Sequence, residues 1–249
     1  MKFRPTFWPT VCFVPMFLSL LALGGWQLQR LYWKEGLIAQ RTAAVSAPAI
    51  PLPSDPAAAP GFDFRHLGIE GEFLNDRELF LGASTDGGAA GYHVVTPFKL
   101  KATSDQKDGG VILVDRGWIT SNLKDPAKRA EGQITGTVKI EGLLRLPPKG
   151  RPNFFVPENR CDINYWFYVD IPAMASCVHL EGVLPYYMDA GPAPNAGGWP
   201  KGGQSRLSMP SDHLQYALTW FLLAAALAFI YYLYHRRLGE PKPEGSDKA

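Results

Sequence analysis

Cysteine is scarce in this chain, and neither sign of charge predominates. The 249 residues include three cysteines, and 25 Lys and Arg stand against 23 Asp and Glu. Proteins that bind nucleic acid usually have a basic stripe or tail, so this balance excludes nucleic acid as a partner. An aromatic content of 12% excludes a disordered chain, and the length fits one domain with accessory segments.

Familiar catalytic and ligand-binding motifs are also missing. The sequence has no nucleophile elbow, phosphate-binding loop, dinucleotide fingerprint or paired-cysteine zinc pattern. Its Gly-Gly pairs at 87–88, 197–198 and 202–203 lack the flanking strand and helix of such loops, so we predict turns there. Neither an activated nucleophile nor an acid–base pair can be placed. We therefore do not expect an enzyme.

A long apolar run lies near the start of the chain. No charged residue occurs between Arg4 and Arg30, and the segment 11–26 is almost wholly apolar. This length predicts a transmembrane helix over residues 9–29. The charged start and the small residues at 22–24 leave a cleaved signal peptide as the alternative.

A second apolar run lies near the end of the chain. It reads LQYALTWFLLAAALAFIYYLY from Leu214 to Tyr234, has aromatic residues near both ends, and is followed at once by three basic residues. Aromatic side chains favour the two headgroup levels of a bilayer. The pattern predicts a transmembrane helix over 213–234 and a short tail at 235–249.

Two spans place both termini on one side of a membrane and residues 62–207 on the other. The positive charges flanking the spans are nearly equal on the two sides, so the orientation rests partly on the resemblance given below. No long basic presequence precedes the first span, which argues against mitochondrial import. We expect both termini in the cytoplasm of a bacterium, the spans in its inner membrane, and the central region in the periplasm.

The region between the spans divides into a linker and a domain. The linker, 30–61, has five prolines between Pro48 and Pro60, which is the composition of an extended spacer. In the domain, 62–207, short strand-like runs alternate with turn residues and only 171–180 looks helical. The strand-like runs are 64–73, 78–81, 93–100, 111–118, 137–146, 166–169 and 183–188. We predict an α+β membrane protein in which two transmembrane helices flank a strand-rich domain, either an antiparallel sheet or barrel-like.

Two cysteines of the domain have two interpretations. Cys161 and Cys177 are sixteen residues apart and would form a disulfide in an oxidising compartment. Alternatively, Met174, Cys177 and His179 fall on one short helical stretch and have the soft ligand chemistry that selects copper. The other interpretation of Met174 and Cys177 is that they simply face the core.

His213 stands at the entrance of the second span. Asp212 and Gln215 have the spacing of a cap pair, so the imidazole projects from the first helical turn. Ionisable residues at the edge of lipid are functional candidates, and neutral imidazole is an axial ligand of haem iron. The alternative is a histidine that caps the helix or anchors it among lipid headgroups. Trp220 continues the same helical face.

Gly24 and Gly25 are the small residues of the first span. They would let the two spans approach closely, or leave a slot beside a planar ring. Arg30 lies four residues after Trp26, at the same membrane surface, where a guanidinium can meet a haem propionate. These positions predict a haem site formed by His213 as the metal ligand with Trp220, Gly25 and Arg30.

Several blocks of the sequence carry a resemblance to a known family. They are LGGWQLQRLYWKEGLI from Leu23, GYHVVTPF from Gly91, ILVDRGWI from Ile112, FVPEN from Phe155, and GGQSRL followed by HLQYALTW between Gly202 and Trp220. In this order, between two spans, they resemble the Surfeit locus protein family, the cytochrome c oxidase assembly factors also called Shy-type proteins.

The resemblance implies a chaperone-like, non-catalytic function in building cytochrome c oxidase. Bacterial members of the family are linked to haem a and to its delivery, so the expected partners are the catalytic subunit of a haem-copper oxidase, a haem a synthase and the lipid bilayer. By motif, His213 of HLQYALTW is the candidate haem ligand. A scaffold that stabilises an oxidase intermediate without haem is the alternative function.

Overall fold

The structure is a computed structural model that describes every residue except 1–4, 54, 85–89, 103–108, 205–210 and 239–249. The chain divides into two compact units. One is a pair of helices formed by the two ends of the chain, Met1–Gln40 and Ser208–Ala249. The other, Arg41–Leu207, contains all six strands found in the described part of the chain. Each unit is described by itself.

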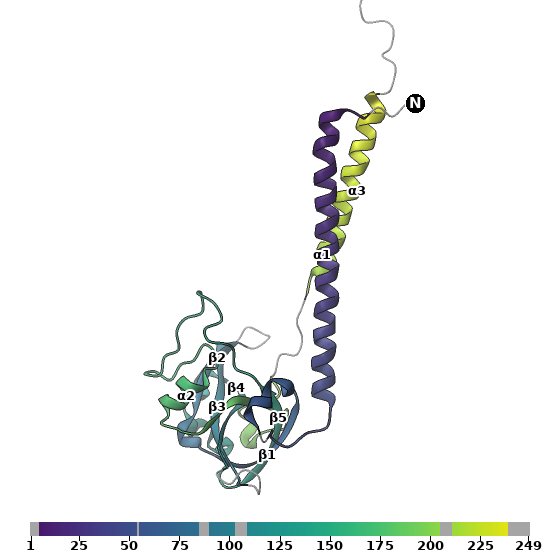
Figure 1. The fold of residues 1–249 in the computed structure, drawn as a ribbon. Coiled ribbons are helices and arrows are strands. Elements are labelled where there is room, and N and C mark those ends of the chain that lie inside the picture. Colours follow the sequence, from purple (N-terminus) through teal and green to yellow (C-terminus); the bar gives the residue numbers. More distant parts are fainter. Residues whose placement is uncertain (1–4, 54, 85–89, 103–108, 205–210, 239–249) are drawn as a thin grey trace, which may run out of the picture. The chain divides into compact units, whose positions relative to one another are not determined.

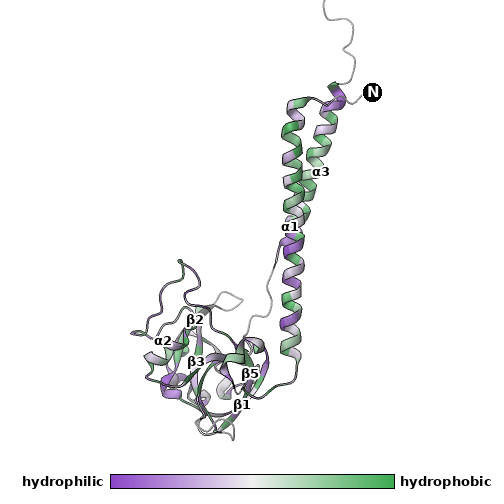
Figure 2. Ribbon diagram, viewed as in Figure 1, coloured by the Kyte–Doolittle hydropathy of each residue, from purple (hydrophilic) through white to green (hydrophobic). Residues whose placement is uncertain are grey.

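The helical unit contains α3, His213–Leu238, and most of α1, Phe7–Ser46, whose residues 41–46 fall in the other unit. Contacts between Gln27 and His213 at one end and between Thr6 and His235 at the other show that the helices run antiparallel. Both helices are long and apolar enough to span a membrane (Figure 2). Only 6% of the apolar window of α1 and 11% of that of α3 are buried within the protein. A core helix of a soluble protein would be mostly buried, so these exposed apolar surfaces fit two membrane-spanning helices.

The first helix extends well beyond the predicted span of 9–29. It continues as one helix to Ser46, so residues 30–46 are not linker as we predicted. The extension is rich in Leu, Ala, Lys, Glu, Gln and Arg, which are good helix formers, and Pro48 follows its end. Hydropathy predicts where the apolar surface of a helix ends. The helix itself continues through polar residues until a residue that disfavours helix, here Pro48, follows.

The proline-rich segment packs on the domain and is not the extended spacer that we predicted. Ile50 pairs with Leu67 of the first strand, and residues Pro56–Phe62 form a short 3-10 helix capped by Asp55. Ala59 of this turn is 2% exposed and belongs to the hydrophobic core. The domain therefore begins before residue 62.

The domain is a small closed barrel (Figure 1). Its strands are β1 (His66–Phe73), β2 (Leu79–Ser84), β3 (Ala90–Leu100), β4 (Val111–Thr120), β5 (Val138–Arg145) and β6 (Val183–Ala190). Neighbours follow the order β1-β5-β6-β4-β3, and an additional β1–β3 pairing closes five strands into a ring. The strand β2 pairs with the other end of β3. All pairings are antiparallel except β4–β6, which is parallel. The predicted barrel-like, strand-rich domain between two apolar helices is confirmed.

Strand β4 is buried on both faces because hydrophobic clusters lie on each side of it. Ile112 and Val114 face one cluster, and Leu113 faces the other, which is covered by α2, Ile171–Cys177. The predicted run 166–169 is wrong as a strand, because Trp166 makes only an isolated bridge with Leu81. Its indole ring is 1% exposed, so its hydrophobic character reflects core packing.

Candidate functional site

His213 and Gln27 meet at one end of the helix pair. His213 Nδ1 lies 2.7 Å from the side-chain oxygen of Gln27 on α1. In this orientation of the Gln27 amide its oxygen faces the ring, and an amide oxygen only accepts hydrogen bonds, so we assign the proton to Nδ1. In a neutral imidazole the other nitrogen, Nε2, then keeps its lone pair. With this assignment, the hydrogen bond favours the tautomer in which Nε2 is available as a ligand atom.

The opposite end of the helix pair holds a second polar cluster. His235 is fully buried, and its Nε2 lies 3.0 Å from the Thr6 hydroxyl, while Nδ1 lies 2.8 Å from the Tyr231 carbonyl oxygen. The Thr10 and Tyr231 hydroxyls are 2.6 Å apart, and Phe13 stacks on Tyr231 with ring centroids 4.0 Å apart. Both ring nitrogens of His235 are therefore engaged by its neighbours.

The two polar clusters are spaced like the two surfaces of a bilayer. Positions 6 and 27 are separated by roughly 32 Å along α1, at a rise of ~1.5 Å per residue. The hydrocarbon core of a bilayer is about 30 Å thick. The apolar length of both helices lies between His213 and His235, and this separation fits one histidine at each surface of a bilayer.

Gly24 lies between the helices, but Gly25 does not. Gly24 is buried, and a Cβ atom added to it would come within 2.6 Å of the Phe221 ring on α3. A Cβ atom added to Gly25 would meet nothing within 4 Å. The expectation that both glycines lie at the helix contact is wrong for Gly25, because one residue of helix turns the position about 100° away from the partner.

The remaining predicted haem-site residues surround His213 only in part. Trp220 is half-buried on the inner side of α3, two turns from His213. The Arg30 guanidinium is exposed and stacks on Trp33, with Cζ 4.1 Å from the ring centroid. Arg30 follows Gln27 by three positions, so both residues lie on one side of α1. Gln27 itself was missed by our prediction. Its signal was a polar side chain just inside the end of an apolar run.

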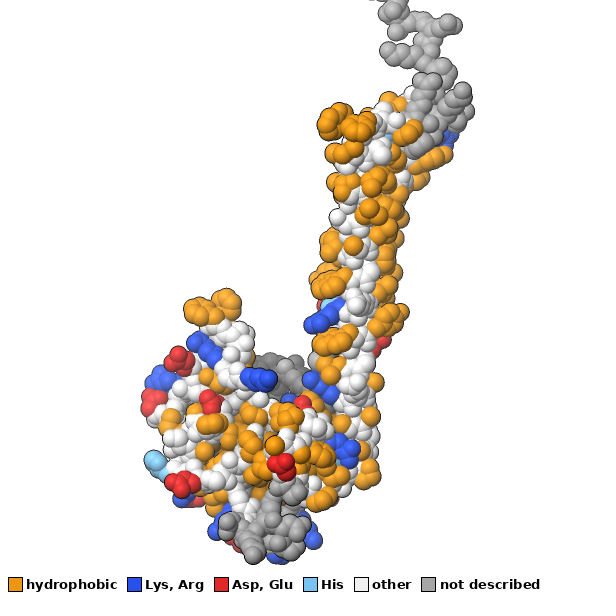
Figure 3. All heavy atoms as spheres, viewed as in Figure 1, with side chains coloured by type: hydrophobic (Ala, Val, Ile, Leu, Met, Phe, Trp, Pro, Cys, Tyr) orange, Lys and Arg blue, Asp and Glu red, His pale blue; other side chains and the backbone are white. Residues whose placement is uncertain are grey.

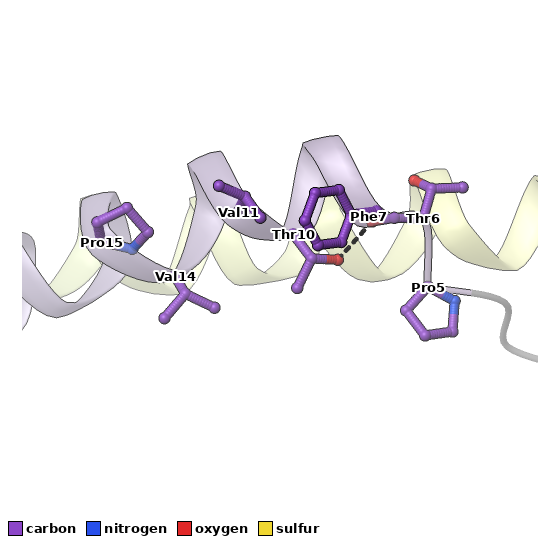
Figure 4. A pocket seen from close by; sticks show the side chains of 7 residues that line it. All are labelled: Pro5, Thr6, Phe7, Thr10, Val11, Val14 and Pro15. Atoms are coloured by element: carbon purple, nitrogen blue, oxygen red, sulfur yellow. Dashed lines mark hydrogen bonds between the residues drawn. The ribbon is translucent and has the colours of Figure 1, made fainter.

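An open depression on the helix pair lies away from His213. It follows the first turns of α1 and is lined by Pro5, Thr6, Phe7, Thr10, Val11, Val14 and Pro15 (Figure 4). Thr10 donates a hydrogen bond to the Thr6 carbonyl oxygen at 2.7 Å, which satisfies its hydroxyl locally. Five of the seven lining residues are apolar, and the depression lies at the His235 end, so we interpret it as lipid-facing surface.

The copper interpretation of the domain is wrong. Cys161 and Cys177 form a disulfide, which removes the thiolate that a copper site would need. Met174 is fully buried in the cluster beneath α2. Within the described ranges, no group of three His, Cys, Asp or Glu side chains could hold a metal ion.

Two clusters of polar side chains in the domain stabilise its fold. His93 Nδ1 lies 2.7 Å from the Asp115 carboxylate across the β3–β4 pair, beside a small depression. Deeper inside, Arg129 donates two hydrogen bonds to the buried Glu78 carboxylate. Arg116, 1% exposed, lies 3.9 Å from Glu78. Burial lowers the pKa of Arg116 to about 10, and the Glu78 charge opposes this shift. These buried contacts connect Arg116 of β4 and Glu78, which precedes β2, to Arg129 in the turn at 126–132, and so stabilise the packing of that turn on the barrel.

Comparisons with known proteins agree with this architecture. The family model described as the SURF1 family matches residues 14–225, from within the first span into the second. The chain is 37% identical to Surfeit locus protein 1 of Mus musculus over 239 residues, covering 88% of this chain and 75% of that protein. It is 35% identical to Surfeit locus protein 1 of Homo sapiens over 230 residues, with 86% and 73% covered. A SURF1-like protein of Drosophila melanogaster is 34% identical over 231 residues, with 86% and 73% covered. A barrel domain between two apolar helices, with a family match across all three parts, places this chain in the SURF1 family.

Proposed function

We propose that this chain is a two-pass membrane assembly factor for cytochrome c oxidase. In this proposal it holds haem a at His213 and assists its insertion into the catalytic subunit of the oxidase, without catalysing a reaction. Membership of the SURF1 family supports the assembly function, through the resemblance described above. The observation that carries the haem site is the hydrogen bond between His213 and Gln27.

The donor chemistry at His213 would fit a bond to haem iron. Neutral imidazole supplies such a bond through the nitrogen that has no proton, and the second nitrogen is normally fixed by an outer hydrogen-bond acceptor. Gln27 provides this acceptor. His213 begins α3 at a membrane surface, where a large apolar macrocycle can stay in lipid while its propionates stay near water. Arg30 is the nearby cation that we assign to a propionate.

The other side chains assigned to the site contribute apolar contact. Trp220 is half-buried on α3 and would offer a flat aromatic surface two turns along the helix from His213. Gly25 faces open space and has no side chain, so it would leave room beside the helix for the macrocycle. The haem would supply the group that is handed to the oxidase, and the chain's own residues would bind and orient it. A haem a synthase is the donor partner we propose.

We propose a bacterial inner membrane as the location, with the barrel domain in the periplasm and both termini in the cytoplasm. The Cys161–Cys177 disulfide supports an oxidising compartment for the domain. His235, Arg236 and Arg237 in the last turn of α3 support a cytoplasmic end there.

The test uses the full chain purified in detergent from cells that make haem a. We expect the wild-type spectrum to show bound haem a, and His213→Ala to lose part of it with a shifted spectrum. Partial loss is expected because burial of the macrocycle and its lipid tail persists without the ligand. His213→Met should retain more haem than His213→Ala, because a thioether also ligates haem iron.

Unchanged haem content and spectrum in His213→Ala would contradict the ligand role. A wild-type protein that carries no haem a under these conditions would favour the haem-free scaffold. Normal oxidase assembly in cells that carry His213→Ala would then favour the haem-free scaffold, whereas impaired assembly would favour a function that needs His213.

A further inference from the structure

Two phenylalanines are fully presented to solvent at the tip of one loop of the barrel domain. Phe154 is 85% exposed and Phe155 is 90% exposed, the highest values for large apolar side chains in the described part of the chain. They lie in residues 147–160, here named the aromatic loop, which follows β5. In Figure 1 the segment around residue 150 projects from the domain near α2.

The aromatic loop is held in shape by its own hydrogen bonds. The Asn153 side-chain oxygen accepts from the backbone N–H groups of Phe155 at 2.9 Å and Val156 at 3.2 Å. The Arg151 guanidinium donates to the carbonyl oxygens of Phe154, at 2.8 Å, and Val156. Four prolines restrict the rest of the loop, at positions 147, 148, 152 and 157. The exposure of the two rings is therefore built into an ordered turn, and docking them costs little conformational entropy.

Basic side chains adjoin the two rings. Arg151 Cζ lies 5.9 Å from the Phe154 ring centroid, and Lys149 is exposed two residues earlier. The Glu158 carboxylate lies 3.8 Å from Arg151, so the loop retains a small positive excess. Aromatic rings beside Lys and Arg are the combination that favours the headgroup region of a bilayer, where rings enter the interface and cations meet phosphates.

The domain is tied closely to lipid by its own chain. Lys201 pairs with Trp118 inside the domain, and His213 already begins α3. Twelve residues span at most roughly 40 Å when fully extended, so Lys201 cannot be farther than this from the start of α3. A two-ring contact is weak for a free protein. For a tethered domain the same contact is intramolecular and benefits from a high effective concentration.

We propose that the aromatic loop inserts Phe154 and Phe155 into the interface of the membrane that α1 and α3 span, and so holds the barrel domain against this bilayer. The occupant is lipid, because the tip offers two protruding rings on a narrow turn with adjacent cations, and the tether keeps phospholipid within reach. The loop then fixes which side of the barrel faces water.

The test places a photoreactive benzoylphenylalanine at position 155 of the full chain. The matched control carries it at Lys139, whose side chain is 81% exposed on β5 of the same domain. Irradiation is carried out in nanodiscs of phosphatidylethanolamine and phosphatidylglycerol and in membranes of the expressing cells. We expect at least a fivefold higher yield of phospholipid adduct at position 155 than at 139 in both settings.

Equal lipid yields at the two positions would overturn the proposal. A protein adduct that replaces the lipid adduct at position 155 in cell membranes would also overturn it and assign the loop to a protein partner. A second variant, Phe154→Ser with Phe155→Ser, should keep the thermal unfolding midpoint of the domain, because neither ring is buried. Placed in this variant, the probe at position 149, an exposed position of the same loop, should give at least threefold less lipid adduct than the same probe in the unsubstituted loop. An undiminished yield would contradict insertion of the rings.

Discussion

Gln27 lies almost one turn after Gly24 on α1, and its side-chain oxygen is the hydrogen-bond acceptor for His213. The sequence indicated His213 because an ionisable residue at the edge of a membrane span is a candidate functional residue. It did not indicate Gln27, because the two residues are 186 positions apart and only the antiparallel pairing of the helices brings them together. Pairwise contacts of this kind depend on helix rotation, which hydropathy does not specify.

Replacing Gln27 with Leu should weaken haem a binding by about 10- to 100-fold, the usual effect of removing an outer-shell partner of a ligating histidine. Gln29→Leu is the matched control, since Gln29 is exposed and two positions away on the same helix. The measurement is haem titration together with the 15N chemical shifts of the His213 ring. A single tautomer retained in Gln27→Leu would show that Gln27 does not orient the ring.

Tyr186 is a buried polar residue of the barrel interior. Its side chain is 0% exposed, and its hydroxyl finds no hydrogen-bond partner among the described residues. A buried hydroxyl without a partner costs about 1–3 kcal/mol. We expect Tyr186→Phe to raise the free energy of unfolding by about 1 kcal/mol at neutral pH, measured as a higher melting temperature. A lower melting temperature would indicate a bound water at the hydroxyl.

The same residue predicts a dependence on alkaline pH. Burial raises the pKa of Tyr186 to about 12, above its usual value of 10.0. The folded domain therefore binds more protons than the unfolded chain between these values, so stability is complete below pH 10 and falls toward pH 12. Tyr186→Phe should flatten this fall. Some dependence should persist, because burial also raises the pKa of Tyr187.

At the scale of elements, strands were easier to predict than helix ends. Each of the six strands overlaps a predicted run, because Gly, Pro, Asn and Asp mark the turns between them. The parallel β4–β6 pairing was not predictable, since it joins strands distant in the sequence. The end of α1 at Ser46 was missed because the apolar surface and the helix end at different places.

The packing of α1 on α3 predicts different effects for two adjacent glycines. Gly24→Leu should force the helices apart against Phe221 and cost about 1–3 kcal/mol as overpacking. Gly25→Leu is the matched control, because it faces open space and should change stability little. Thermal unfolding in detergent, followed by tryptophan fluorescence, measures both. Equal destabilisation by the two variants would contradict the described helix contact.

At the scale of the whole molecule, the two apolar helices come from the two ends of the sequence, and the strands of the barrel come from the residues between them. Apolar side chains cover the helices, whereas charged side chains gather on the barrel domain (Figure 3). This division of surface is what a two-pass protein requires, because lipid and water each meet the surface that suits them.

Reporter fusions test the proposed orientation. A reporter joined after Ala249 should be active in the cytoplasm, and one inserted between residues 101 and 109 should be active in the periplasm. The physical reason is that two spans return the chain to its starting side. Equal sidedness of the two reporters, or a mature protein that begins after Gly24, would contradict the two-span arrangement.

The place of β6 in the barrel has a consequence for synthesis of the protein. This strand is the last of the six in sequence, yet it lies between β5 and β4. A nascent chain that ends before Val183 leaves the facing edges of β4 and β5 without their shared neighbour, and such open edges invite pairing with other chains. The barrel can therefore close only after almost the whole domain has been synthesised. Until then the exposed strand edges of the nascent domain favour aggregation.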